Sequence, residues 1–279
     1  MKTKNSTKKK LAAFALPALL LSFGFYGMIL WTGCGVNSGS VLVLGLMWVP
    51  AVSALFSKLM VDHSIRGMGW RIHAQSLPCL GIAYLLPLVL CGVVYGLAWS
   101  TGIGTLGEFS FSQTAVFATA GVVINCLAAM GEEIGWRGFL LTELRQLMPV
   151  RQASAVIGVV WFLYHAPVIV FSDYNNGNIP CSLLCFFVMV MAFTFVADAL
   201  CVKARSFWPA VVLHASHNVF VQSIFDPITV TGRYTRFVTS EFGAGLALAY
   251  LAAALLLCAG MKNQEGKENP VKAVPHRTR

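Results

Sequence analysis

Three short groups of polar residues interrupt the apolar segments of this 279-residue chain and could carry chemistry. The first contains two adjacent carboxylates, Glu132 and Glu133, followed by Arg137. Ionisable groups are costly inside a membrane, so those found there are functional candidates by default. Glu133 and Arg137 are four residues apart on one helix face, and we expect them to pair. Glu132 projects about 100° away from that pair, so its carboxylate is expected to be free of Arg137. The alternative is that both acids are solvated charges at the end of a helix.

The other two groups place histidines and an amide in later apolar segments. His165 lies in an aromatic run just before Pro167, where it could exchange protons or bond to a neighbouring helix. His214 and Asn218 are four residues apart and project from one helix face, with His217 at its edge. A glutamate beside a histidine can deprotonate water, and histidine with asparagine can stabilise an oxyanion. Together the three groups therefore contain the components of a hydrolase.

The same residues also allow a metal-dependent hydrolase. His165, His214 and a glutamate, Glu132, could bind zinc, which would then activate the water. The sequence contains neither His-Glu-x-x-His nor Gly-x-Ser-x-Gly, which argues against a zincin and against a serine nucleophile. The residue types leave the cofactor open between zinc and none.

The composition of the chain is that of an integral membrane protein. Hydrophobic residues make up 57% of it, charged residues only 11%, and the mean hydropathy is +0.72, whereas roughly a quarter of the residues in soluble domains are charged. The net charge of +9 is spread over short loops and tails, so it does not indicate nucleic-acid binding. The eight cysteines form no CxxC pair and are expected to be buried free thiols.

Apolar runs of about 20 residues predict an all-α polytopic membrane protein with about eight transmembrane helices. We place these spans at 11–31, 40–61, 77–100, 113–134, 152–172, 179–201, 207–225 and 242–261. If the N-terminus is cytoplasmic, all of the 20 Lys and Arg residues fall inside except Arg233 and Arg236. This asymmetry follows the positive-inside rule and predicts that both termini are cytoplasmic.

The spans divide the chain into three parts. Residues 1–10 are expected to be a solvated basic cytoplasmic arm, residues 11–261 the transmembrane domain, and residues 262–279 a polar cytoplasmic tail. The segment 137–151, with apolar residues at helical spacing and charges between them, is expected to be a helix lying at the cytoplasmic interface, ended by Pro149.

Taken in series, the three groups resemble the motifs of the CPBP family, which contains type II CAAX prenyl endopeptidases and the bacteriocin-processing and self-immunity proteins of the Abi group. The residues that carry the resemblance are Glu132-Glu133-x-x-x-Arg137, His165 after its aromatic run, and His214-x-x-x-Asn218. The resemblance covers roughly residues 120–220, which would be the protease-like core. In the family the second motif is usually Phe-x-x-x-His, whereas this chain has Trp161 at the Phe position.

The resemblance implies catalytic roles for four residues. Glu132, helped by His165, would activate water, and His214 with Asn218 would form the oxyanion site. The Glu133–Arg137 pair would support them, and His217 has no assigned role. The family is often labelled as metalloproteases, although a metal-free glutamate mechanism has also been proposed for it, so the cofactor stays open.

The leading hypothesis is an intramembrane endopeptidase of the cell membrane that hydrolyses a peptide bond near the cytoplasmic face of the bilayer. Its partners would be the lipid bilayer and a membrane-associated peptide or protein, not nucleic acid. One alternative is a non-proteolytic bacteriocin self-immunity or partner-binding protein. Another is a proton-coupled transporter, since intramembrane Glu and His also build proton relays. The transporter is disfavoured because the sequence shows no internal repeat.

Overall fold

The computed structural model describes residues 2–36, 40–74 and 76–265, and these are mostly helical. Outside the fourth predicted span and its continuation, the longer helices are α1 (Lys2–Thr32), α2 (Val41–Asp62), α3 (Ser76–Ser100), α7 (Val150–Phe171), α8 (Ile179–Ala204), α9 (Trp208–Asn218) with the π-helical turn η4 (Val219–Phe225), and α11 (Ala244–Glu265). A short helix, α10 (Thr235–Val238), precedes α11. Two strands, β1 (Gly104–Leu106) and β2 (Thr229–Thr231), pair antiparallel with Gly104 opposite Thr231. Residues 266–279 of the expected tail lie outside the described residues.

The fold is that of an all-α polytopic membrane protein, as the sequence predicts. Among the described residues, six helices are long and apolar enough to cross a membrane, and α11 is apolar over Ala244–Leu257. Large apolar side chains are exposed along the outer faces of these helices, among them Leu20 of α1, Leu127 of α5 and Leu256 of α11. So much exposed apolar surface indicates contact with lipid rather than with water.

The fourth predicted span is part of a longer helix. The elements α4 (Phe111–Val116), η2 (Phe117–Gly121), α5 (Val122–Glu133), η3 (Ile134–Leu140) and α6 (Leu141–Leu144) follow one another without a break, and η2 and η3 are π-helical. The segment 137–151, expected to form a helix, is helical through Leu144, where it continues α5. Phe139 and Leu144 are buried in the protein, and Pro149 caps the start of α7 instead of ending a helix. Glu132 therefore lies about three helical turns before the end of this helix.

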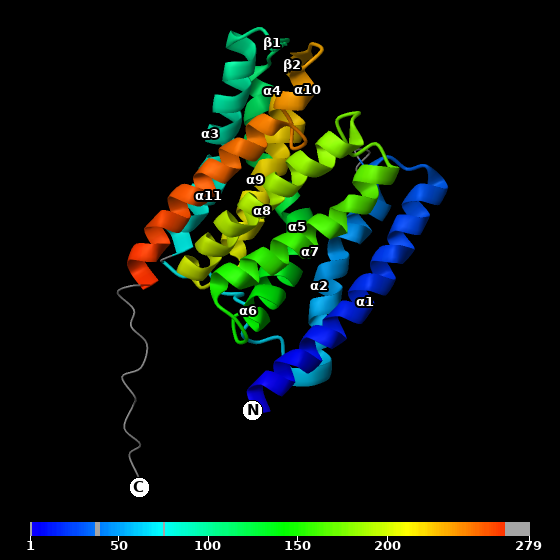
Figure 1. Ribbon diagram of the computed structural model, residues 1–279, viewed down its shortest axis with the longest axis vertical. Coiled ribbons are helices and arrows are strands. Elements are labelled where there is room, and N and C mark those ends of the chain that lie inside the picture. Colours follow the sequence, from blue (N-terminus) through cyan, green and yellow to red (C-terminus); the bar gives the residue numbers. More distant parts are fainter. Residues whose placement is uncertain (1, 37–39, 75, 266–279) are drawn as a thin grey trace.

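The connecting loops gather at two ends of the helix bundle (Figure 1). One end, the basic end, contains the start of α1 and the connections 63–74, 145–149 and 205–207. There Trp208 Nε1 donates a hydrogen bond of 2.9 Å to the Trp70 carbonyl oxygen. The other end, the strand end, contains β1 and β2 and the connections 33–36, 101–110, 172–178 and 226–243. There Asn176 Nδ2 donates a hydrogen bond of 3.1 Å to the Phe242 carbonyl oxygen.

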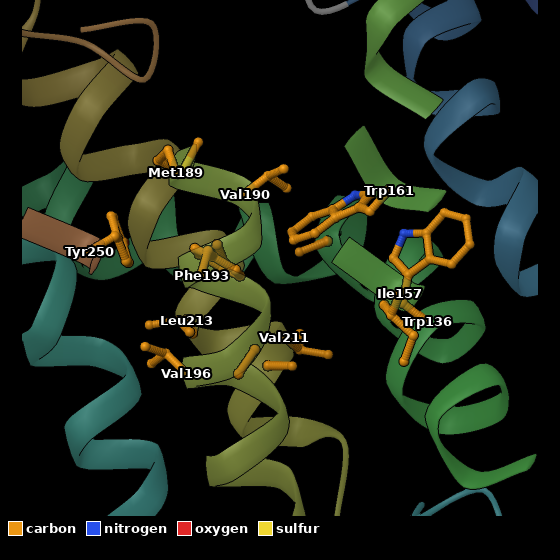
Figure 2. Close-up of a cluster of buried hydrophobic side chains, with 14 of the residues drawn as sticks. Trp136, Ile157, Trp161, Met189, Val190, Phe193, Val196, Val211, Leu213 and Tyr250 are labelled. Atoms are coloured by element: carbon orange, nitrogen blue, oxygen red, sulfur yellow. The ribbon is translucent and has the colours of Figure 1, made fainter. Parts of the chain in front are cut away.

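Packing between the helices brings the motif-bearing segments together in the middle of the bundle. α1 packs on α2, α2 on α5, α5 on α9, and α9 on α3, while α8 lies between α7 and α11. Figure 2 shows part of this core, in which Phe193 of α8 lies between Trp161 of α7 and Tyr250 of α11, with ring centroids 5.3 and 5.5 Å away. The helices α5, α7 and α9 are therefore held in fixed relative positions.

The basic arm expected at residues 1–10 is part of helix α1. Lys10 is only 6% exposed, and its Nζ lies 2.6 Å from Glu143 Oε1 of α6 and 3.2 Å from Asp62 Oδ2 of α2. Lys58 also pairs with Asp62. The expectation of a solvated arm is therefore wrong at Lys10, whose buried ammonium group joins three helices at the basic end.

Gly135 is required because α2 and the π-helical segment η3 approach closely. A Cβ atom added at Gly135 would lie 2.4 Å from the Pro50 Cβ and 2.8 Å from the Pro50 carbonyl oxygen. We predict that Gly135→Ala lowers the free energy of unfolding in detergent by about 1–3 kcal/mol, as overpacked cores do. Gly92→Ala is the matched control, because nothing lies within 4 Å of the added Cβ there. Equal stability of the two variants would contradict the close contact.

Candidate active site

One cavity of about 720 Å³ is lined by all four residues that the sequence nominates for catalysis, Glu132, His165, His214 and Asn218. They come from three different helices, α5, α7 and α9. Because these helices are far apart in the sequence, only the packing of the bundle brings the four side chains to one cavity. The arrangement combines a carboxylate, two imidazoles and an amide around a space large enough for a peptide segment.

The Glu132 carboxylate accepts hydrogen bonds from two indoles. Trp136 Nε1, one turn later on the same helix, lies 3.1 Å from Glu132 Oε2, and Trp161 Nε1 of α7 lies 2.5 Å from the same oxygen. Both indoles are drawn in Figure 2. Because both bonds reach Oε2, neither engages Oε1. The buried carboxylate is therefore fixed by two donors while one of its oxygens is left to take up a proton.

The second carboxylate, Glu133, is at the centre of a buried charged network. Arg137 Nη1 lies 3.0 Å from Glu133 Oε1 and 2.9 Å from Oε2, so the pair expected from the four-residue spacing is present. Arg137 Nε also donates to Asp198 Oδ1 of α8 at 3.0 Å. His214 Nδ1 lies 2.9 Å from Glu133 Oε1. A carboxylate only accepts hydrogen bonds, so Nδ1 of His214 carries the hydrogen and its Nε2 is the nitrogen free for a ligand.

His165 is oriented in a similar way by its own helix. Its Nδ1 lies 2.9 Å from the Trp161 carbonyl oxygen one turn earlier, and a carbonyl also only accepts. In the neutral ring Nε2 therefore carries the lone pair that can accept a proton. The ring lies against Phe186 and Tyr174, with centroids 5.1 and 6.2 Å away. These contacts restrict the ring, which suits a group that must meet a water molecule in one orientation.

The amide of Asn218 is also held by a neighbour. Its Nδ2 donates to Asn125 Oδ1 of α5 at 3.4 Å, and Asn125 lines the same cavity. His217 does not line it. Its Nδ1 lies 3.0 Å from the Tyr250 hydroxyl, and its ring packs on Phe193. The structure thus separates the two histidines of this motif, with His214 at the cavity and His217 in the core.

The residues nominated for zinc do not form a metal site in this structure. Within residues 2–36, 40–74 and 76–265, no three His, Cys, Asp or Glu side chains gather closely enough to hold an ion. We therefore derive no step of a reaction through a metal.

A polar wall continues the cavity beyond these residues. Glu241 accepts hydrogen bonds from the Tyr174 hydroxyl at 2.7 Å and from Gln222 Nε2 at 2.9 Å. Burial raises the pKa of the Glu241 carboxyl group to about 7, although the two hydrogen bonds oppose this shift. Since all three residues line the cavity, it contains polar groups that favour the presence of water.

Two features of the site were missed in the sequence. Asp198 is the only acid in the apolar run 179–201, so the rule that selected Glu132 would also have found it. Trp161 occupies the position where the family motif usually has Phe, and its indole N–H bonds to Glu132, which a Phe ring could not do. No spacing rule pairs Trp161 with Glu132, because they are on different helices.

Comparison with known proteins finds a family match over the region that contains these residues. Residues 114–220, which hold every motif residue described above, match the model of a family described as type II CAAX prenyl endopeptidase Rce1-like. The family resemblance inferred from the three motifs is confirmed, with boundaries close to the 120–220 expected.

A curated relative gives the same result. CAAX prenyl protease 2 of Methanococcus maripaludis is 29% identical to this chain over 145 residues, which cover 49% of the chain and 51% of the relative. The matched region thus spans about half the length of that relative. The similarity concerns about half of each protein, and the activity of the whole protein is a separate question.

Proposed function

We propose that this protein is a membrane-embedded endopeptidase of the cell membrane that hydrolyses a peptide bond in a membrane-associated peptide or protein. The observation that carries the proposal is the convergence of Glu132, His165, His214 and Asn218 on one cavity, in a region that matches the Rce1-like family. A buried carboxylate with one uncommitted oxygen supplies a proton acceptor, and the imidazoles and the amide supply partners for the carbonyl group.

The proposed reaction uses only the side chains of this chain. Glu132 Oε1, assisted by His165 Nε2, accepts a proton from a water molecule while the water oxygen bonds to the carbonyl carbon of the substrate. The carbonyl oxygen becomes an oxyanion, to which Asn218 Nδ2 and the Nε2–H of His214 in its imidazolium form donate hydrogen bonds. The proton on Glu132 then passes to the amide nitrogen as the C–N bond breaks, which releases an amine and a carboxylic acid.

We also propose a depth for this chemistry that differs from the position expected from the sequence. The span 113–134 would place Glu132 at the cytoplasmic end of a helix, and hence the bond near the cytoplasmic face. In the structure the helix continues from Glu132 through Leu144. We therefore propose that the bond is cut inside the bundle, at the depth where α5, α7 and α9 converge.

The test is peptide hydrolysis by the purified protein in detergent. Membrane-associated peptides are incubated with the wild type and with Glu132→Gln, and the products are identified by mass spectrometry. We expect new peptide termini only with the wild type, unchanged by a zinc chelator. Cleavage of no peptide, combined with protection or partner binding that survives Glu132→Gln in cells, would favour the non-proteolytic immunity or binding protein instead.

Trp161 is expected to act as a positioning residue for Glu132. Trp161→Phe keeps an aromatic ring but removes the N–H donor to Glu132 Oε2. Hydrogen bonds to charged groups contribute about 1.5–3 kcal/mol, so we predict a decrease in kcat of roughly 10- to 100-fold. KM should change little, because the bond does not involve the substrate.

The control for this variant is Trp70→Phe, which removes an indole bond to the Ile65 carbonyl oxygen at the basic end. It should leave kcat unchanged. If Trp161→Phe has wild-type kcat and KM, the hydrogen bond does not position the carboxylate; a rise in KM alone would likewise contradict this role.

A further inference from the structure

The active-site cavity extends toward one end of the bundle. From Glu132 of α5 its lining continues through the second half of α7, the first turns of α2, and the turn η4. It ends at connections of the strand end, where the lining residues include Asn175, Thr231 and Arg236. In Figure 1 this end carries β1 and β2 and lies opposite the N-terminus. The cavity therefore leads from the catalytic residues to the strand end.

Toward the basic end, buried side chains separate Glu132 from the surface. The next residues of the helix, Trp136, Arg137 and Phe139, are each at most 2% exposed. A second cavity of about 800 Å³ lies at the basic end and reaches Arg137, but its lining includes none of the four candidate catalytic residues. The buried Arg137 network thus separates that cavity from the Glu132 carboxylate.

The distribution of charge assigns the two ends to opposite sides of the membrane. In the described connections of the strand end, the only Lys and Arg residues are Arg233 and Arg236. The basic end carries Arg66, Arg71 and Arg145 among others. Cytoplasmic loops are the ones enriched in Lys and Arg. The strand end, and with it the open end of the cavity, is therefore extracytoplasmic by this rule.

We propose that the substrate reaches Glu132 from the extracytoplasmic face, as a peptide segment exposed at the outer surface of the membrane. This inference rests on the proposed function, and it specifies the class of substrate. The two walls of the cavity fit such a segment. The α2 part of the lining contains Val43, Leu44 and Met47, which suit apolar side chains, whereas Gln222 and Ser223 of η4 are polar and suit water and the peptide backbone.

The experiment measures access to the cavity with a membrane-impermeant maleimide. Ser223→Cys places a thiol on the cavity wall, and Arg66→Cys places a matched thiol on the exposed loop of the basic end. Both are made in a Cys34→Ser background, because Cys34 lies at the strand end and is partly exposed. Labelling is compared between right-side-out vesicles, inside-out vesicles and detergent, after subtraction of the background protein.

We expect Ser223→Cys to react in right-side-out vesicles as fully as in detergent, and Arg66→Cys to react only in inside-out vesicles or detergent. The reverse pattern would overturn the inference, since the cavity would then open to the cytoplasm. Thr231→Cys, on the exposed rim of the cavity, is a second labelling position in case the Ser223 variant does not fold. If Thr231→Cys reacts from outside while a folded Ser223→Cys does not, access from this face is also refuted.

Maleimide labelling does not require catalysis, and peptide hydrolysis in detergent does not depend on the side from which the substrate enters. The two experiments therefore test the direction of access and the proposed function independently. Glu132-dependent hydrolysis with cytoplasmic labelling of Ser223→Cys would preserve the proposed function and reject the direction of access. External labelling without any Glu132-dependent hydrolysis would reject the proposed function, and with it the assignment of a peptide substrate.

Discussion

Replacing Glu132 with Gln is expected to lower kcat for peptide hydrolysis about 10²- to 10⁴-fold, which is the range contributed by general acid–base groups. The amide has the size of the carboxylate, and its oxygen can still accept the indole bonds of Trp136 and Trp161. What it cannot do is accept a proton from water at neutral pH. The substitution therefore removes the proposed chemistry while it retains most of the surrounding contacts.

The measurement is kcat in detergent, together with a thermal unfolding curve for each protein. Glu108→Gln is the control, since Glu108 is an exposed acid at the strand end. We expect this control to have wild-type kcat and both variants to unfold near the wild-type temperature. A folded Glu132→Gln variant with undiminished kcat would show that another group activates the water.

The second large effect is expected at Arg137, on stability. Arg137→Met would leave the carboxylates of Glu133 and Asp198 buried without the guanidinium that lies within 3.0 Å of both. Removing one partner of a buried ion pair typically costs about 3–5 kcal/mol. The substitution also removes the cation from its place over the Trp161 ring, 4.6 Å from the ring centroid. We therefore expect a lower free energy of unfolding by roughly this amount.

Unfolding in detergent measures this effect, with Arg145→Met as the control because Arg145 is exposed on the same helical region. The control should change stability little. Adding Asp198→Asn to Arg137→Met should recover part of the loss, since it removes one of the two unpaired charges. If Arg137→Met is as stable as the Arg145 control, the network is not the structural element inferred from its geometry.

The sequence by itself determined the membrane class, the approximate spans and the identity of the candidate site residues. Apolar runs must be long enough to cross the bilayer, and acids or histidines inside them are costly, so both features are visible without a structure. The pairing of Glu133 with Arg137 was also predictable, because residues four apart on a helix are neighbours.

Only the tertiary structure decided which groups from different helices meet. Asp198 joins Arg137, His214 joins Glu133, and Trp161 joins Glu132 across helix interfaces that no local spacing describes. The same is true of the buried Lys10, which a sequence-based prediction places in solvent.

The direction of the cavity is likewise a property of the packed bundle. The motifs locate Glu132 along one helix, but the walls of the cavity come from α2, α5, α7, α9 and the strand-end connections together. Periodicity and spacing report contacts within one element, whereas a cavity is enclosed by several elements. For that reason the sequence nominates the residues of the site, and the fold decides the side from which a substrate can reach them.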